Sequence, residues 1–153
     1  MTIYKHTQIG YLMISITLVV LALFAWLQIT ARAESPSHDS GANFVMTALM
    51  ACMVLVLASF STLMVHIDEC VLEIRFGWGI FRKQFVLAEI ATVKKVRNRW
   101  YYGWGIRWWL WPQMWVYNVS GLDAVELTMT NGKVYRIGTD EPEQLESAIR
   151  SRT

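Results

Sequence analysis

The stretch Gly10-Tyr-Leu-Met-Ile-Ser-Ile-Thr-Leu-Val-Val-Leu-Ala-Leu-Phe-Ala-Trp-Leu-Gln-Ile-Thr-Ala31 decides the class of this chain, because it contains no charged residue. An α-helix rises about 1.5 Å per residue, so roughly 20 residues cross the ~30 Å hydrocarbon core of a bilayer. Ser15, Gln28 and two threonines are its polar side chains. The stretch therefore predicts a membrane-spanning helix.

A second apolar run extends from Phe44 to Ile67 and contains no proline, Asp, Glu, Lys or Arg. Residues 32–42, between the runs, are polar and include turn formers, so we expect a short loop and an antiparallel arrangement. A transmembrane hairpin is therefore predicted for residues 1–67, with spans at 10–31 and 44–67. A second domain is predicted for residues 68–153.

A secretory signal peptide is the alternative for the first run. Lys5 precedes the run, and Ala31-Arg32-Ala33 resembles a cleavage site with small residues. The apolar region of a signal is about 7–15 residues long, which is shorter than this run. The length favours a membrane span, and the second run predicts a span in either case.

Aromatic and basic residues concentrate after the second run. Six of the eight tryptophans fall between residues 100 and 115. Trp and Tyr favour the bilayer–water interface, because the ring is apolar while its N–H or O–H needs a polar partner. Between Arg75 and Arg107, Glu89 is the one carboxylate among many Lys and Arg, and anionic lipids attract such segments. The predicted membrane-interface residues are Lys94, Lys95, Arg97, Arg99, Trp100, Trp104, Arg107, Trp108, Trp109 and Trp111. Alternatively, the tryptophans fill the core of a small barrel.

The basic residues also predict an orientation. Lys5 and Arg32 lie on opposite sides of the first span and cancel, whereas the basic segment beginning at Arg75 follows the second span. Cytoplasmic segments carry the excess of Lys and Arg. Both termini are therefore predicted to lie in the cytoplasm.

From residue 71 the pattern becomes that of β-strands. Residues 71–76 alternate with period two and place Leu72, Ile74 and Phe76 on one face. Further along, the sequence predicts a turn at 77–79, a strand at 81–86, a corner at 87–90 and a strand at 91–98.

The clearest hairpin signal is Ala124-Val-Glu-Leu-Thr-Met-Thr-Asn-Gly-Lys-Val-Tyr-Arg-Ile137. A two-residue Asn-Gly turn would place apolar Leu127 opposite Arg136 and mix the two faces. A three-residue Thr-Asn-Gly loop, with the glycine left-handed, instead places Glu126 opposite Arg136. We expect this second register, in which Leu127 faces Tyr135 and Val125 faces Ile137.

The chain ends in a predicted helix. Asp140 is the expected N-cap, and Glu143 three residues later completes a capping box. Leu145 and Ile149 share one face and are expected to cover one end of the sheet. Residues 68–153 therefore predict six or seven short antiparallel strands followed by one helix.

The order of these elements and three motifs resemble a family of small bacterial membrane proteins with two helices and a C-terminal PH-like domain. The motifs are Trp115-Val-Tyr-Asn-Val-Ser-Gly121, Ala124-Val-Glu-Leu127 and Arg136-Ile-Gly-Thr-Asp-Glu-Pro142. The resemblance implies an α+β membrane protein: a two-helix transmembrane hairpin followed by a PH-like antiparallel β-barrel or sandwich that a C-terminal helix caps. It also implies the bacterial inner membrane, and it supplies no catalytic residue.

The sequence indicates no catalytic, cofactor or metal site. It contains no Ser/His/Asp or Cys/His arrangement and no Gly-rich phosphate loop, so enzymatic activity is not expected. Cys52 and Cys70 have no further ligand at metal spacing and are expected to be small buried side chains. Basic residues interleaved with aromatics also occur in single-strand nucleic-acid grooves, but the adjacent membrane spans explain them more simply.

Together these features predict a membrane-anchored, non-catalytic interaction module that presents a PH-like domain at the cytoplasmic membrane surface. The expected partners are the lipid bilayer and either a protein or a second copy of the chain, with no nucleic acid and no cofactor. The alternative is a lipid-headgroup-binding or lipid-sensing protein of envelope homeostasis.

Overall fold

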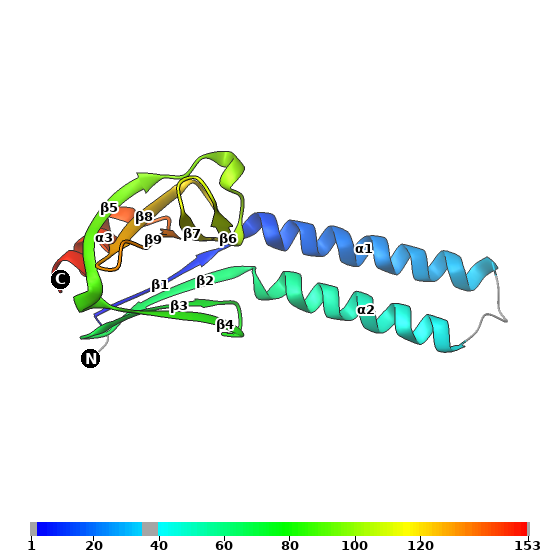
Figure 1. The fold of residues 1–153 in the computed structure, drawn as a ribbon. Coiled ribbons are helices and arrows are strands. Elements are labelled where there is room, and N and C mark those ends of the chain that lie inside the picture. Colours follow the sequence, from blue (N-terminus) through cyan, green and yellow to red (C-terminus); the bar gives the residue numbers. More distant parts are fainter. Residues whose placement is uncertain (1–2, 35–39, 153) are drawn as a thin grey trace.

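The computed structural model of the chain describes residues 3–34 and 40–152, without the side chains of residues 32–34 and 40–43. It shows an α+β protein in which two long helices extend from one end of a β domain (Figure 1). The polar loop expected at 32–42 falls largely outside the described residues.

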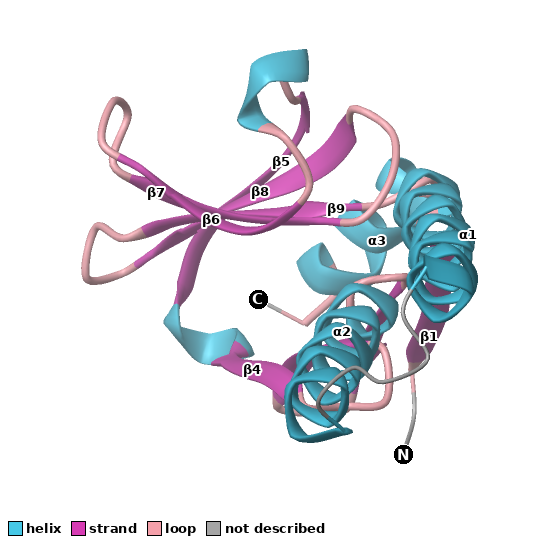
Figure 2. Cartoon of the chain, turned by 90° about the vertical axis from the view of Figure 1, so that its right-hand side faces the viewer, coloured by secondary structure: helices cyan, strands magenta, loops and turns pink. Residues whose placement is uncertain are grey.

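The two long helices, α1 (Tyr11–Glu34) and α2 (Ser40–Ser59), run antiparallel and side by side (Figures 1 and 2). Gln28 donates a hydrogen bond from Nε2 to Oγ1 of Thr47 across the pair, at 3.3 Å. In α1, Tyr11–Ala31 is long and apolar enough to cross a membrane. Only 6% of that segment is buried, so its apolar side chains face outward rather than into a protein core.

The second apolar run is divided between a helix and a strand, so the span predicted at 44–67 is wrong in its C-terminal part. α2 ends at Ser59, and Thr62–Ile67 forms strand β2. Every second residue of β2, beginning with Leu63, is buried, which is the period-two pattern of a strand. The continuous hydrophobicity concealed this alternation, because Met64 on the opposite face is also apolar.

The N-terminal tail is also a strand, which its polar composition did not predict. β1 (Tyr4–Ile9) pairs with β2 in antiparallel register, and the last pair is Ile9 with Thr62. Because α1 and α2 lie between these strands in the chain, the helices form an insertion in a β-hairpin. The boundary expected at residue 67 is therefore replaced by a β domain that contains both β1 and β2, and these strands raise the strand number above the six or seven expected.

The β domain consists of two sheets. The first is antiparallel, with the order β1-β2-β3-β4, where β3 is Val71–Phe76 and β4 is Phe81–Val86. The second has the order β5-β8-β9-β7-β6 and includes a parallel pair, β7 with β9, where antiparallel pairs were expected. Its strands are β5 (Ile90–Arg97), β6 (Gly105–Trp109), β7 (Met114–Asn118), β8 (Asp123–Met129) and β9 (Val134–Gly138). Two short 3-10 helices, η1 (Leu87–Glu89) and η2 (Trp100–Tyr102), precede β5 and β6.

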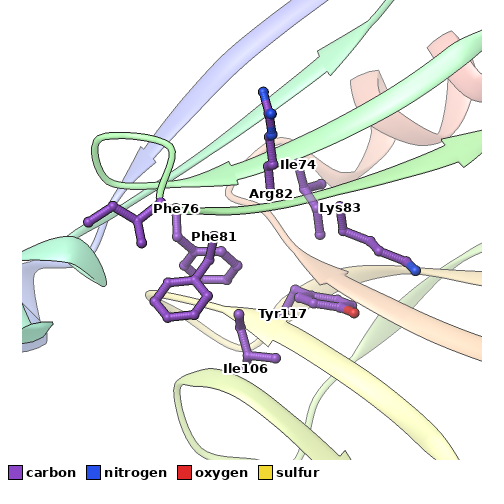
Figure 3. A pocket seen from close by; sticks show the side chains of 8 residues that line it. Ile74, Phe76, Phe81, Arg82, Lys83, Ile106 and Tyr117 are labelled. Carbon is purple, nitrogen blue, oxygen red and sulfur yellow. The ribbon is translucent and has the colours of Figure 1, made fainter.

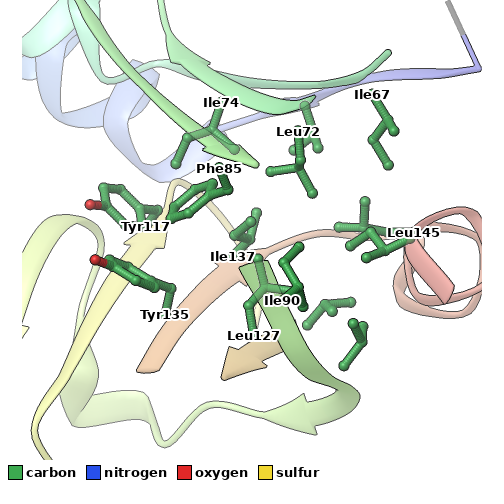
Figure 4. Close-up of a cluster of buried hydrophobic side chains, with 14 of the residues drawn as sticks. Ile67, Leu72, Ile74, Phe85, Ile90, Tyr117, Leu127, Tyr135, Ile137 and Leu145 are labelled. Carbon is green, nitrogen blue, oxygen red and sulfur yellow. The ribbon is translucent and has the colours of Figure 1, made fainter. Parts of the chain in front are cut away.

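The core lies between the two sheets and beneath α3 (Pro142–Arg150) (Figure 4). The predicted inner face of β3, with Leu72, Ile74 and Phe76, is buried there. Leu145 and Ile149 of α3 are also fully buried, as expected. Burial of each large apolar side chain contributes about 1.5–3 kcal/mol, so this core is the main source of stability in the β domain.

The hairpin of β8 and β9 confirms the predicted register. Leu127 lies opposite Tyr135, and Glu126 lies opposite Arg136. Nε of Arg136 donates to Oε2 of Glu126 at 2.8 Å. Gly132 has a φ of +80°, the left-handed conformation that the three-residue loop requires.

The capping box predicted for the last helix does not form. The N-cap is Glu141, which makes no side-chain capping hydrogen bond, and Pro142 occupies the first turn. Oδ1 of Asp140 instead lies 2.6 Å from Nε2 of His6 in β1, and Glu143 pairs with Lys95 in β5. The two acids are therefore used to attach the helix to other strands, which their local spacing does not reveal.

The turn after β3 packs directly against the end of α2. N–H of Gly77 donates to the carbonyl of Thr62 at 2.9 Å, and a Cβ on Gly77 would lie 2.4 Å from the carbonyl oxygen of Ser59. The ring of Phe60 stacks on Phe81 at 5.2 Å between centroids. The last turn of α2 and the β3–β4 turn are thus held against each other.

Replacing Gly77 with alanine should destabilise this junction more than the same change at Gly79. Both glycines have positive φ, +49° and +87°, so each substitution has a backbone cost of about 1–3 kcal/mol. Only at Gly77 does the added methyl meet a backbone atom; nothing lies within 4 Å of a Cβ at Gly79. Thermal unfolding of the full chain in detergent should show the lower Tm for Gly77→Ala. Equal Tm values for the two variants would contradict the described junction.

Candidate functional site

One end of the β domain adjoins the long helices, and we call it the helix-proximal end. It consists of the β3–β4 turn (residues 77–80), η2 and β6. The turn touches Ser59, as described above, and β6 is the strand of its sheet that lies nearest α1 (Figure 1). The segment after β7 closes the contact, since a Cβ on Gly10 would lie 3.0 Å from the carbonyl oxygen of Val119.

Large apolar side chains are exposed at the helix-proximal end. Trp78 is 68% exposed, Ile80 66% and Trp100 76%. We call the exposed set the aromatic rim: Trp78, Ile80, Phe81, Trp100, Tyr101 and Trp108. Several large apolar side chains exposed at one end of a domain favour an interaction site for a protein or a membrane. The rim lies where α1 and α2 leave the domain, so any bilayer that the helices cross would face it.

The cations near this end lack close carboxylates. In the described part of the chain, Arg82 and Lys83 of β4 and Arg107 of β6 have no carboxylate oxygen within 4 Å. Arg75 differs, because its Nη2 lies 2.8 Å from Oε2 of Glu73. Hydrogen bonding to Arg75 lowers the pKa of the Glu73 carboxyl, and the pair is close to neutral as a unit.

Two lysines at the opposite edge of the second sheet are paired with carboxylates. Nζ of Lys94 lies 3.5 Å from Glu126, and Lys95 pairs with Glu143. Both lysines belong to β5, which is separated from β6 by three strands. Lys94 and Lys95 are therefore neutralised by acids from other elements, whereas Arg82, Lys83 and Arg107 are not.

The predicted membrane-interface residues fall into two groups. Arg99, Trp100, Trp104, Arg107, Trp108, Trp109 and Trp111 come from η2, β6 and the segments that join or follow them. Lys94, Lys95 and Arg97 lie on β5 and are not brought together with the tryptophans. Sequence proximity does not distinguish the groups, because β5 and β6 are neighbours in the chain and opposite edges in the sheet.

Trp109 and Trp111 have different environments. Trp109 is half-buried and packs on Tyr102 at 5.0 Å between ring centroids, beside buried Met114 and Val116. The alternative that tryptophans fill the domain interior therefore holds for Trp109. Trp111, in the β6–β7 turn, is 90% exposed.

Six helix-proximal residues were not among the predicted set: Trp78, Ile80, Phe81, Arg82, Lys83 and Tyr101. For Trp78 and Ile80 a signal was present in Gly77-Trp-Gly-Ile80, because large apolar residues are unusual in turns, which are normally polar. The expectation that both cysteines are buried is also wrong. Cys52 on α2 and Cys70 before β3 are exposed.

A cavity of about 230 Å³ opens between the sheets at this end (Figure 3). β4 and β6 form its two sides, and its walls include Phe76, Phe81, Ile106 and Tyr117. Burial, together with the neighbouring Tyr135, raises the pKa of the Tyr117 hydroxyl to about 12, so that hydroxyl remains a neutral hydrogen-bonding group.

Away from the helix-proximal end, a cluster of polar side chains joins β1 to the start of α3. Nδ1 of His6 lies 3.3 Å from Oε2 of Glu141, and the Tyr4 hydroxyl donates to the same oxygen at 3.4 Å. Within residues 3–34 and 40–152, no group of three or more His, Cys, Asp or Glu is placed to hold a metal ion. These contacts hold the N-terminal strand β1 against the segment that begins α3, and we call this cluster of Tyr4, His6, Asp140 and Glu141 the clasp.

The clasp should weaken in alkali. Burial and the Glu141 carboxylate raise the pKa of Tyr4 from 10.0 to about 12, so the unfolded chain loses this proton first. Stability from this group is complete below pH 10 and declines as the pH rises towards 12. Chemical unfolding should show a steeper decline over this range for the wild type than for Tyr4→Phe, and parallel declines would contradict this assignment.

Comparisons with known proteins give no assignment. No family model matches the chain, and no curated protein or solved structure matches it. What the chain does has to follow from its own residues and geometry.

Proposed function

We propose that the chain is a membrane-anchored, non-catalytic interaction module. A transmembrane hairpin of α1 and α2 holds a PH-like β domain against the cytoplasmic face of a bacterial inner membrane. One observation carries the proposal: the apolar helices and the aromatic rim occur at the same end of the β domain.

The lengths of both helices fit a membrane hairpin. The apolar segment of α1 contains 21 residues, and α2 contains 20, which corresponds to about 30 Å of helix. The strictly apolar part of α2, Phe44–Ser59, is shorter, but α2 lies beside α1 over its length (Figure 1). Exposed Phe44, Leu49 and Leu55 on α2 favour a hydrocarbon environment over water.

Two sheets with a packed C-terminal helix support the PH-like assignment. The parallel β7–β9 pair and the additional strand β1 depart from an all-antiparallel PH-like arrangement. The assignment therefore concerns the general architecture and transfers no binding residue.

The chemistry of the helix-proximal end suits a bilayer surface. Indole rings settle in the headgroup layer, and each Lys or Arg near an anionic leaflet gains about 1 kcal/mol. Arg75, Arg82 and Lys83 lie close to the end of α2, which favours a cytoplasmic β domain under the positive-inside rule. Docked in this way, the domain presents its remaining surface to a protein partner or a second copy of the chain.

The two native cysteines report the proposed topology. A membrane-impermeant maleimide should label Cys70 in everted inner-membrane vesicles and not in right-side-out vesicles. It should label Cys52 in neither until SDS dissolves the bilayer, because a thiol in hydrocarbon forms no reactive thiolate. Mass spectrometry of the labelled chain identifies each site.

Cys52→Ser and Cys70→Ser are the matched single-thiol controls. Labelling of Cys70 from the outside would invert the proposed orientation. Labelling of Cys52 in intact vesicles would show that α2 is outside the bilayer, and the proposed anchor would then be wrong.

Contact of the rim with the bilayer is measurable by spin labels in proteoliposomes. In a chain with both cysteines replaced by serine, a nitroxide at Ile80→Cys should be more accessible to O₂ than to a water-soluble nickel chelate. A nitroxide at Lys133→Cys, in the exposed β8–β9 turn, should show the reverse. If residue 80 is as accessible to nickel as residue 133, the domain stands clear of the membrane.

A further inference from the structure

The two sheets leave an opening between their edge strands. β4 is the last strand of the first sheet, and β6 is the last strand of the second. The cavity described above lies between them, and its wall residues come from both strands and from their neighbours β3 and β7. Each edge therefore faces the cavity.

The cavity is apolar towards the helices. Phe81 lines it and also stacks on Phe60, which directly follows α2. Ile80, in the exposed turn, lines the same space, and Ile106 of β6 closes the other side. A chain of methylene groups that enters from the bilayer would therefore meet apolar side chains first.

The cavity is polar at its other end. Lys83 lies opposite Ile74 in the sheet register, so it belongs to the inner face of β4. Its side chain and the Tyr117 hydroxyl point towards the same end, away from α2 (Figure 3). Arg82, the preceding residue on β4, points to the other face of the sheet, so Lys83 is the cation at this end of the cavity (Figure 3). This cationic end is complementary to a phosphate.

An inward-pointing lysine on an edge strand has another explanation. Such charges prevent edge strands from pairing with other chains, and that role requires no ligand. It accounts for Lys83 but not for the apolar cavity beneath it. If Lys83 only protects the edge strand, filling the cavity with a larger side chain should change no ligand binding. If the cavity holds a ligand, filling it should displace that ligand.

We propose that this opening binds one anionic phospholipid from the surrounding bilayer. The phosphate lies at Lys83 and Tyr117, and an acyl chain runs along Phe76, Phe81 and Ile106 towards the helices. The inference rests on the proposed membrane anchor, because the lipid is drawn from the leaflet on which the rim docks. It adds a lipid-binding role to an interaction module.

Native mass spectrometry of the full-length protein in mild detergent tests the site. The protein is incubated with dioleoylphosphatidylglycerol, dioleoylphosphatidylcholine or oleate. The wild type should retain one phosphatidylglycerol and prefer it to phosphatidylcholine. Ile106→Trp, which fills the cavity, should reduce the retained phosphatidylglycerol at least fivefold, whereas Val86→Trp, on the exposed outer face of β4, should not.

Lys83→Gln is the second variant, and it leaves the cavity walls intact. It should reduce the preference for phosphatidylglycerol over phosphatidylcholine about fivefold, the effect of one cation near an anionic headgroup. Lys133→Gln is its control. Thermal unfolding of each variant checks that the fold is retained, and Lys83→Gln decides the outcome if Ile106→Trp does not fold.

Unchanged retention in Ile106→Trp, or an unchanged preference in Lys83→Gln, would overturn the proposed site. Retention of oleate in place of phosphatidylglycerol would overturn the proposed occupant. The measurement contains no bilayer, so it is independent of rim docking. Failure of the anchor would be seen in the cysteine labelling, and failure of the site would be seen here.

Discussion

The direct pairing of β1 with β2 is the constraint on which the rest of the structure depends. The pair of Ile9 with Thr62 closes the base of the helical insertion, so α1 and α2 must begin and end at one edge of the first sheet. Gly10 and Gly77 provide the close approaches that this geometry needs, against Val119 and Ser59. Because backbone atoms fill these contacts, the helices cannot tilt freely relative to the β domain, and its helix-proximal end has a fixed orientation.

Sequence patterns predicted the elements that are determined by residues close together in the chain. The β8–β9 register followed from one glycine and one charge pair, Glu126 with Arg136, all within a short segment. β1 and β2 were not predicted, since β1 is mostly polar and β2 continues an apolar helix without a break. The parallel pairing of β7 with β9 joins segments separated by β8, and no pattern within either strand specifies such a neighbour.

In the candidate site, too, the sequence predicted features that depend on local composition and missed those that depend on contacts between distant elements. The cluster of tryptophans from residue 100 onward was predicted, because aromatic composition is visible along the chain. The pairing of Lys94 and Lys95 was not, because Glu126 and Glu143 reach β5 from other elements. Positive charges that look equivalent in the sequence thus differ in space, because a nearby carboxylate neutralises some of them and not others.

Exposed edges and exposed aromatics are normally hazards for a soluble domain, since both promote aggregation. Here β4 and β6 face each other across a cavity, and an inward charge such as that of Lys83 disfavours the addition of a further strand to β4. The aromatic rim belongs to the end of the domain from which the two apolar helices leave. A bilayer around those helices would cover the rim and would supply the one abundant molecule that is apolar along its length and anionic at one end. The features that would promote aggregation of this domain in water are therefore the ones that the proposed membrane docking would cover.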